Sequence, residues 1–235
     1  MAKAHTSWKV LPHGAIEKLT ERVWRVEGAL PNMPLKRVMT VVKRSDGSLV
    51  VHNAIPLADA EMAEIDAWGR VAMIVVPNGY HRLDARVFHE RFPAARVICP
   101  AGARKKVEEV VPVSGTYDDE PGDAVVRFET LDGTRGGEGA MIISDGGGTT
   151  LVLNDLVFNM PHATGFTGFV LRRVTGSSGG PKMSRIARWF IARDKPALKT
   201  HLEKLAGLPE LRRVIVSHHQ VIDQPGVLRQ IAASL

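Results

Sequence analysis

The fold is decided by the stretch VAMIVVPNGYHRLD, residues 71–84. Its first half, Val71–Val76, is a continuous apolar run, which is typical of a strand that is buried on both faces of a sheet. Its second half is polar and carries Asn78, His81 and Asp84. In α/β folds, ligand sites gather at the carboxyl ends of such strands. The stretch therefore predicts a buried strand that delivers polar side chains to one edge of a sheet.

Strand-like and helix-like segments alternate on both sides of this stretch. Ser45–Ser48 is a turn signal between two apolar runs and predicts a hairpin. Met62, Ile65 and Trp68 recur at helical spacing, and Gly69 is typical of the end of such a helix. We expect strands at Val23–Val26, Arg37–Lys43, Leu49–His52, Val71–Val76, Arg96–Cys99, Ala124–Leu131, Ala140–Ile143, Thr149–Leu153 and Val214–Val216. We expect helices at Ala58–Trp68, Leu83–Phe92, Ala103–Val110, Ser184–Ala192, Pro196–Ala206 and Pro225–Leu235.

The connections between these elements contain no linker that would separate two parts of the chain. Ser144–Gly148 must be a tight connection between two strands, and Gly176–Lys182 is interpreted as a flexible loop within the domain. Sheets with helices on their outer faces bury all the apolar surfaces of such a chain. We therefore expect an α/β protein with one domain that covers residues 1–235.

The composition is that of an ordinary globular protein, with 44% hydrophobic and 24% charged residues in a chain of 235. No apolar run reaches the roughly 20 residues of a membrane span, so we expect no membrane association. The polar segment Met1–Val10 has no apolar core of a secretory signal. The single cysteine, Cys99, fits a reducing compartment. We therefore expect a cytoplasmic protein, whose oligomeric state the sequence does not set.

The net charge of +6 permits attraction to polyanions. A nucleic-acid binder would cluster its positive charges and interleave aromatic side chains for stacking. Here the cations are scattered in short groups such as Arg104–Lys106 and Arg212–Arg213, and aromatic residues are only 6% of the chain. The pattern argues against nucleic acid as a partner and leaves a small-molecule ligand open.

Polar clusters follow three of the expected strands. Besides Asn78–Asp84, these clusters are Asn154-Asp155 after one strand and Ser217-His218-His219 after another. Strand ends are often polar, but three that carry acid–base or metal-ligating side chains favour a shared pocket. Successive side chains in a strand point in opposite directions, so we expect one ligand from His218 and His219 rather than two. His52, His89 and His201 are interpreted as a strand-end side chain and two surface side chains.

Five stretches in order, within about residues 22–222, resemble the metallo-β-lactamase fold superfamily. They are Ser48–His52, Ile74–Asp84, Asp132–Glu138, Thr150–Phe158 and Val216–Ile222. The second lies where that superfamily has Thr-His-x-His-x-Asp-His, and the last resembles Pro-Gly-His-Gly-x-Val-Ile. Within the superfamily, the strand Arg37–Val42 and the Pro-Asn-x-x-His pattern also resemble a family of domain-of-unknown-function type. The resemblance implies a four-layer αββα sandwich, with the pocket at one edge of two facing sheets.

The metal motifs of the superfamily are incomplete in this chain. The first motif offers only Asn78, His81 and Asp84, and the histidine of the third motif is missing, which leaves Glu138 as its candidate substitute. Asp155 matches the bridging aspartate, and His218 matches the final histidine. These matches cannot hold two zinc ions, which together need about six to eight ligands.

Two interpretations of the pocket remain. A single divalent, zinc-like ion could be held by His81, Asp155 and His218, which offer two imidazoles and a carboxylate with an open position. Alternatively, no cofactor binds, and Asp155 and His218 pair in a polar pocket, which is the interpretation we favour. Secondary candidates for the same pocket are Asn78, Asp84, Glu138, His219 and His52.

We expect a metallo-β-lactamase-like protein without a full di-zinc site that holds a small ligand in this polar pocket. The alternative is a mononuclear metal-dependent hydrolase for a small ester, thioester or phosphoester, in which the metal lowers the pKa of a bound water. A basic protein that binds nucleic acid is a weaker alternative. In either main case we expect no appreciable di-zinc lactamase-type hydrolysis.

Overall fold

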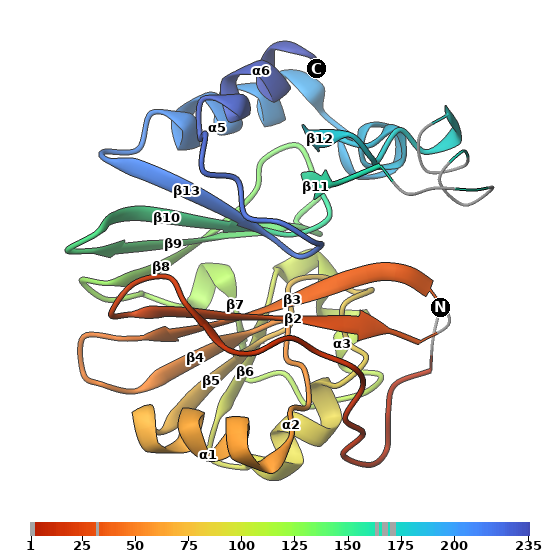
Figure 1. The fold of residues 1–235 in the computed structure, drawn as a ribbon. Helices are drawn as coiled ribbons and strands as arrows, with labels where there is room; N and C mark the ends of the chain where they lie inside the picture. The colour runs from red at the N-terminus through yellow and green to blue at the C-terminus, as the bar shows by residue number, and fades with distance from the viewer. Residues whose placement is uncertain (1–2, 32, 163–164, 166–168, 170–172) are drawn as a thin grey trace.

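Two β-sheets lie face to face, with helices against their outer surfaces (Figure 1). The computed structural model describes residues 3–31, 33–162, 165, 169 and 173–235. Helices α1 (Asp59–Trp68) and α2 (Ala85–Arg91) lie below one sheet in Figure 1, and α5 (Lys195–Ala206) and α6 (Val227–Ala233) lie above the other. This confirms the αββα order that the sequence predicts.

The first sheet has its strands in chain order, antiparallel up to the fourth strand and parallel after it. Its strands are β1 (Glu17–Lys18), β2 (Val23–Leu30), β3 (Met33–Lys43), β4 (Leu49–His52), β5 (Val71–Val75), β6 (Arg96–Cys99) and β7 (Gly115–Thr116). The register pairs Val51 with Ile74 and His52 with Val75. The carboxyl ends of β4 and β5 therefore reach the same edge, as expected for parallel neighbours.

The second sheet has the order β13, β10, β9, β8. Its strands are β8 (Val126–Thr130), β9 (Gly139–Asp145), β10 (Gly148–Leu153) and β13 (Leu211–Val216). Strands β10 and β13 are parallel, and Leu153 is paired with Val216. Asp155 and His218 each follow their strand by two residues, so the register itself brings them out side by side.

The helices between these strands are short, apart from α1 and α5. Helix α3 (Arg104–Val107) follows a single 3-10 turn at Ala101–Ala103, and a second 3-10 turn lies at Tyr117–Asp119. In α5, the Asp194 side chain accepts the backbone N–H of Ala197, and Pro196 occupies the tolerated first turn. No helix in the part of the chain that the structure describes is long and apolar enough to cross a membrane.

Alternating side chains divide the apolar residues among three layers. In β4, Leu49 and Val51 face α1 and α2, while Val50 faces the second sheet. In β10, Leu151 faces α5 and α6, while Val152 faces the first sheet. This period of two follows from the pleat of a strand. Each fully buried aliphatic side chain stabilises the fold by about 1.5–3 kcal/mol, so the sandwich is a rigid support for its edge.

Several parts of the chain differ from the sequence predictions, among them the two-residue strands β1 and β7, which the sequence did not predict. The expected loop Gly176–Lys182 contains strand β12 (Gly180–Lys182), which pairs with β11 (Phe158–Met160), another strand that the sequence did not predict. These strands have three residues each, too few for an alternating pattern to be recognised. Within the expected helix Ser184–Ala192, the turn Ala187–Ile191 is π-helical.

Candidate metal centre

His81, Asp155 and His218 come together at the edge where their strands end. One ligand atom from each residue lies within 4.8 Å of the others. The loops that carry them follow β5, β10 and β13. The structure therefore brings together the three residues that the sequence proposed for one pocket, and it does so through the parallel register of the sheets.

Both imidazoles face the same oxygen atom of Asp155. The distance from His81 Nε2 to Asp155 Oδ1 is 3.0 Å, and the distance from His218 Nε2 to that oxygen is 3.1 Å. The two rings meet edge to face, with their centroids 5.0 Å apart. The Phe158 ring is stacked on His218 at an interplanar angle of 2° and covers one side of the site.

The outer nitrogen of each imidazole faces an atom that can only accept a hydrogen bond. His218 Nδ1 is 2.8 Å from the backbone oxygen of Lys36. His81 Nδ1 is 3.1 Å from Asn53 Oδ1, and the amide nitrogen of Asn53 donates to the backbone oxygen of Val38. The amide of Asn53 is held in that orientation, and the backbone oxygen of Lys36 cannot donate. Each Nδ1 atom must therefore carry the hydrogen of its own contact.

This arrangement determines what the inner nitrogens can be. With Nδ1 protonated, a neutral imidazole has a bare lone pair on Nε2, and both lone pairs would face Asp155 Oδ1. Three electron-rich atoms so close together repel one another, so they need a proton on each nitrogen or a cation between them. An imidazole whose outer N–H bonds a carbonyl or amide oxygen is also the usual arrangement of a metal-ligating histidine.

The charges at this site shift the pKa values of Asp155 and His218 in opposite directions. Burial raises the pKa of Asp155, but the neighbouring His81 and the contact with His218 outweigh burial and hold that pKa well below its usual range. Burial lowers the pKa of His218, but its contact with Asp155 prevails and raises the pKa above the usual value. Both shifts describe a carboxylate that is stabilised by positive charge.

The donor set fits one divalent ion. Two imidazole nitrogens and one carboxylate oxygen, with a position left open to a cavity, are typical of a catalytic zinc site. Asn53 and the Lys36 carbonyl supply the hydrogen bonds that orient the two imidazoles. Sequence reasoning missed Asn53, although an asparagine directly after a strand was a signal. It adopts φ 57°, a left-handed conformation in which asparagine is enriched.

Asn78 lies beside these three residues but presents its nitrogen to them. Asn78 Oδ1 accepts the backbone N–H groups of Tyr80 and His81, at 2.8 Å and 3.0 Å. Its Nδ2 therefore points the other way and donates to Asp155 Oδ2 at 2.8 Å and to Glu138 Oε1 at 2.7 Å. Asn78 thus holds the far oxygen of Asp155, which leaves Oδ1 for the imidazoles.

Glu138 is buried behind Asn78. Burial raises its pKa well above the usual value, the charge of Asp155 raises it further, and the hydrogen bond from Asn78 opposes both effects. Its Oε2 is buried without a hydrogen-bond partner among the described residues. The Asn78 amide therefore bridges the carboxyl groups of Glu138 and Asp155.

Asp84, His219 and His52 lie outside the group of three. The carboxylate of Asp84 is bound by the Arg37 guanidinium and by His5 Nδ1, the latter at 2.7 Å. His219 has φ 64°, and its Nε2 faces the backbone N–H of Lys36. His52 is fully buried, and burial together with the charge of His81 lowers its pKa to about 3, so it is neutral near pH 7.

The prediction that His201 lies on the surface is wrong. Its side chain is buried because α5 packs against the end of the second sheet. The backbone N–H of Asp132 lies 3.2 Å from His201 Nδ1, and Glu129 Oε2 lies 3.3 Å from Nε2. His89, also expected on the surface, is half-buried. Neither residue belongs to the candidate site.

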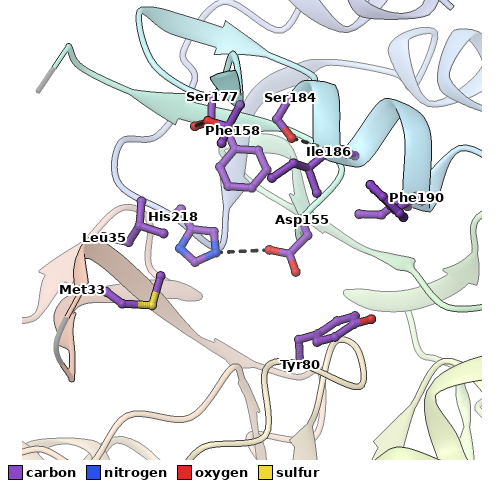
Figure 2. A pocket seen from close by; sticks show the side chains of 13 residues that line it. Met33, Leu35, Tyr80, Asp155, Phe158, Ser177, Ser184, Ile186, Phe190 and His218 are labelled. Carbon is purple, nitrogen blue, oxygen red and sulfur yellow. Dashed lines mark hydrogen bonds and ion pairs between the residues drawn. The ribbon is translucent and has the colours of Figure 1, made fainter. Parts of the chain in front are cut away.

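A cavity of about 550 Å³ opens next to Asp155 and His218 (Figure 2). Figure 2 shows Phe158 and His218 on one side of it, with Ile186 and Phe190 on the helical turn opposite. Its lining residues are mainly apolar, which is usual for a small-molecule site with a few polar groups at one end. The sequence predicted a polar pocket at this edge but not its apolar wall, because the residues of that wall come from distant parts of the chain.

Solved structures of metallo-β-lactamases have the same fold as this chain. No family model and no curated protein matches the sequence. The DIM-1 metallo-β-lactamase exposed to ceftazidime superposes with a TM-score of 0.62 at 13% identity, over 96% of this chain and 99% of that one. A metallo-β-lactamase from Erythrobacter litoralis gives 0.60 at 13% identity, over 94% and 96% of the two chains. The mono-zinc form of FIM-1 from Pseudomonas aeruginosa gives 0.59 at 13% identity, over 96% and 97%. The fold is therefore the metallo-β-lactamase fold, as the ordered motifs predicted.

Proposed function

We propose that this chain is a hydrolase that works with a single divalent metal ion held by His81, Asp155 and His218. The observation that carries the proposal is that two imidazole Nε2 atoms face one carboxylate oxygen, while hydrogen bonds keep both Nδ1 atoms protonated. A divalent cation resolves the repulsion among these three atoms. This geometry moves our preference from the empty polar pocket, which the sequence alone favoured, to a metal site.

We infer one metal ion rather than two from the engagement of the neighbouring side chains. The oxygen of Asn78 is turned toward backbone N–H groups, and the carboxylate of Asp84 is bound by Arg37 and His5. Two zinc ions together need about six to eight ligands. The three remaining donors support a single ion with an open position.

The residues of the chain would have distinct roles in this hydrolysis. His81, Asp155 and His218 would bind the ion, whose chemistry is to act as a Lewis acid and make water a nucleophile at neutral pH. Asn53 and the Lys36 carbonyl orient the imidazoles, and Asn78 fixes Asp155. Phe158 excludes water from one face of His218. The substrate class of the proposal is a small ester, thioester or phosphoester.

A second candidate is a catalytically silent binding module without metal. The observation that favours it is the 3.1 Å contact between His218 Nε2 and Asp155 Oδ1, which raises the pKa of His218, since a protonated imidazole can pair directly with a carboxylate. In that case His81 and His218 act as charged partners of one carboxylate. The two candidates differ in whether added metal changes the protein's activity.

The test is an activity assay of metal-loaded protein. Protein purified without chelator would be incubated with zinc or manganese and assayed on ester, thioester, phosphodiester and lactam substrates. We expect turnover of at least one of the first three that falls at least about 100-fold in Asp155→Asn and His218→Ala. His219→Asn is the matched control, because asparagine tolerates the positive φ and this side chain lies outside the site. Turnover that survives both site substitutions would place the activity elsewhere, and no turnover with any metal would favour the binding module.

A further inference from the structure

The cavity beside the candidate metal centre has an apolar body and one polar end. Its volume is about 550 Å³, within the range of pockets that hold drug-sized ligands. Met33, Leu35, Phe158, Ile186 and Phe190 form most of its apolar wall. Asp155 and His218 line the same cavity, so a ligand that fills it must touch the centre (Figure 2).

Three hydroxyl side chains along the wall, those of Thr175, Ser177 and Ser184, make internal contacts. The hydroxyls of Thr175 and Ser177 are 2.7 Å apart and bond each other, and the Ser184 hydroxyl accepts the backbone N–H of Ala187. None of the described residues that line the cavity is lysine or arginine. The body of the cavity therefore suits an uncharged apolar group, and its described lining offers no lysine or arginine for a phosphate.

The π-helical turn Ala187–Ile191 and the residue before it, Ile186, leave large apolar side chains in water. Ile186 and Phe190 are 52% and 67% exposed, and both line the cavity. Trp189, between them in sequence, is 74% exposed and is not part of the lining. Large exposed apolar groups beside a cavity mark a ligand-binding groove more often than chance, because burial by a ligand removes them from water.

A smaller cavity of about 170 Å³ lies on the other side of Tyr80, Phe190 and Ile191, which line both cavities. Unlike the large cavity, it is lined by Lys106 and by the buried side chains of Asn78 and Glu138. The small cavity thus has a more polar lining than the large one. This arrangement suits a ligand with an apolar part and a polar part.

Building on the proposed function, we propose that the substrate is an ester or thioester of an apolar acyl group, aliphatic or aromatic. The acyl group fills the large cavity, and the carbonyl lies next to Asp155 and His218. The polar alcohol or thiol part extends toward the small cavity. In the reaction, the oxygen of water bonds to the acyl carbon and the acyl–oxygen or acyl–sulfur bond breaks. One proton of the water passes to the leaving alcohol or thiol, and the other remains with the carboxylic acid or is released.

The test measures binding of a hydroxamate series by calorimetry, with zinc-loaded and with metal-free protein. Acetohydroxamate has the metal-binding head alone, and octanohydroxamate adds six methylene groups. Each buried methylene is worth about 0.8 kcal/mol, or roughly fourfold in affinity. With zinc, we expect octanohydroxamate to bind at least about 50-fold more tightly than acetohydroxamate. Equal affinities of the two hydroxamates would overturn the acyl assignment. If acetohydroxamate still binds in that case, the proposed metal centre stands.

Two exposed aromatic residues provide a matched pair of variants. We expect Phe190→Ser to weaken octanohydroxamate about tenfold with little effect on acetohydroxamate, because Phe190 lines the cavity. Trp189→Ser removes a neighbouring exposed aromatic from the same turn and should change neither affinity. An equal loss of octanohydroxamate affinity in both variants would mean that the alkyl group binds to a general apolar surface, which contradicts the proposal.

Metal-free protein separates this inference from the proposed function. In metal-free protein, the affinity should still rise with the length of the alkyl chain, since this effect comes from the cavity. The contribution of the hydroxamate head to the affinity should disappear. Dependence on chain length without any binding of zinc would support the apolar cavity and overturn the metal-dependent hydrolase. Binding of zinc without dependence on the length of the alkyl chain would support the metal centre and overturn the apolar acyl cavity.

Discussion

Asp84 and Asp155 both follow strands of the sandwich and both are surrounded by nitrogen atoms, yet their partners differ in kind. Asp84 has no exposed side-chain surface, and its two oxygens are bound by the Arg37 guanidinium and by His5. Asp155 is 17% exposed, and one of its oxygens faces two imidazoles. A guanidinium is always charged and carries only donors, whereas an imidazole presents a lone pair when it is neutral.

The difference shows which carboxylate has its negative charge compensated by the protein and which needs a further positive charge. Asp84 has a permanent positive partner and needs nothing further. Asp155 becomes satisfied only when a proton or a metal ion enters between it and the imidazoles. The sequence made Asp155 a primary candidate and Asp84 a secondary one, and the identity of their neighbours separates a structural ion pair from a candidate metal centre.

The largest expected effect comes from removing the partner of Asp84. Arg37→Met leaves a buried carboxylate without its guanidinium, and breaking a buried ion pair in this way costs about 3–5 kcal/mol. We expect the free energy of unfolding, measured in urea, to fall by that amount. Arg37→Met combined with Asp84→Asn should recover a large part of the loss. A loss below about 1 kcal/mol would mean that Asp84 is as adaptable as Asp155.

The next effect concerns the orientation of His81. Asn53→Ala removes the oxygen that holds His81 Nδ1–H, and loss of such a support typically lowers metal affinity 10- to 100-fold. We expect a drop of this size in the zinc affinity measured by competition with a chelating dye. Because Asn53 has a positive φ, Asn53→Gly serves as a second variant that keeps the backbone unstrained. Unchanged affinity in both variants would remove Asn53 from the account of the centre.

The smallest effect comes from a third carboxylate, Asp123, which is satisfied by donors alone. Burial raises its pKa, but the backbone N–H groups of Val126 and Val125 and the Arg44 side chain outweigh burial and lower the pKa to about 2. A depressed pKa contributes stability above the unfolded value near 4, and this stability is lost as the pH falls toward 2. Because Asp123 is partly open to solvent, screening reduces this contribution to about 1 kcal/mol at neutral pH.

Urea unfolding of Asp123→Asn checks this contribution. We expect the variant to be less stable than the parent at pH 7 and the difference to shrink between about pH 5 and pH 2. Asp118→Asn, at an exposed position, is the control and should have little effect. A difference between Asp123→Asn and the parent that does not change with pH would assign the loss to packing rather than to charge.

Much of the fold could be predicted because buried strands can be recognised in the sequence as apolar runs. Val71–Val76 is such a run, and the polar residues after this strand and after the strand Thr149–Leu153 supplied His81 and Asp155 as candidates. The short pair β11 and β12 could not be predicted, because three residues show no periodicity. His201 was misplaced, since a histidine on an amphipathic helix gives no sign of which face the neighbouring strands will cover.

The details of the candidate site depend on contacts across long stretches of sequence. The pairing of Asp84 with Arg37 spans 47 positions, and the contact of His218 with the Lys36 carbonyl spans 182. No local pattern contains these partners. The sequence therefore proposed which residues could meet, and tertiary packing determined that Asp84 is neutralised while Asp155 remains open to a cation.

The central claim is tested most directly by the number of zinc ions bound per chain, measured by elemental analysis after loading and dialysis. The account predicts one zinc ion in the parent and in His219→Asn, and none in His81→Ala, Asp155→Asn or His218→Ala. Zinc that is absent from the parent, or that remains in all three site variants, would contradict a metal centre at these residues.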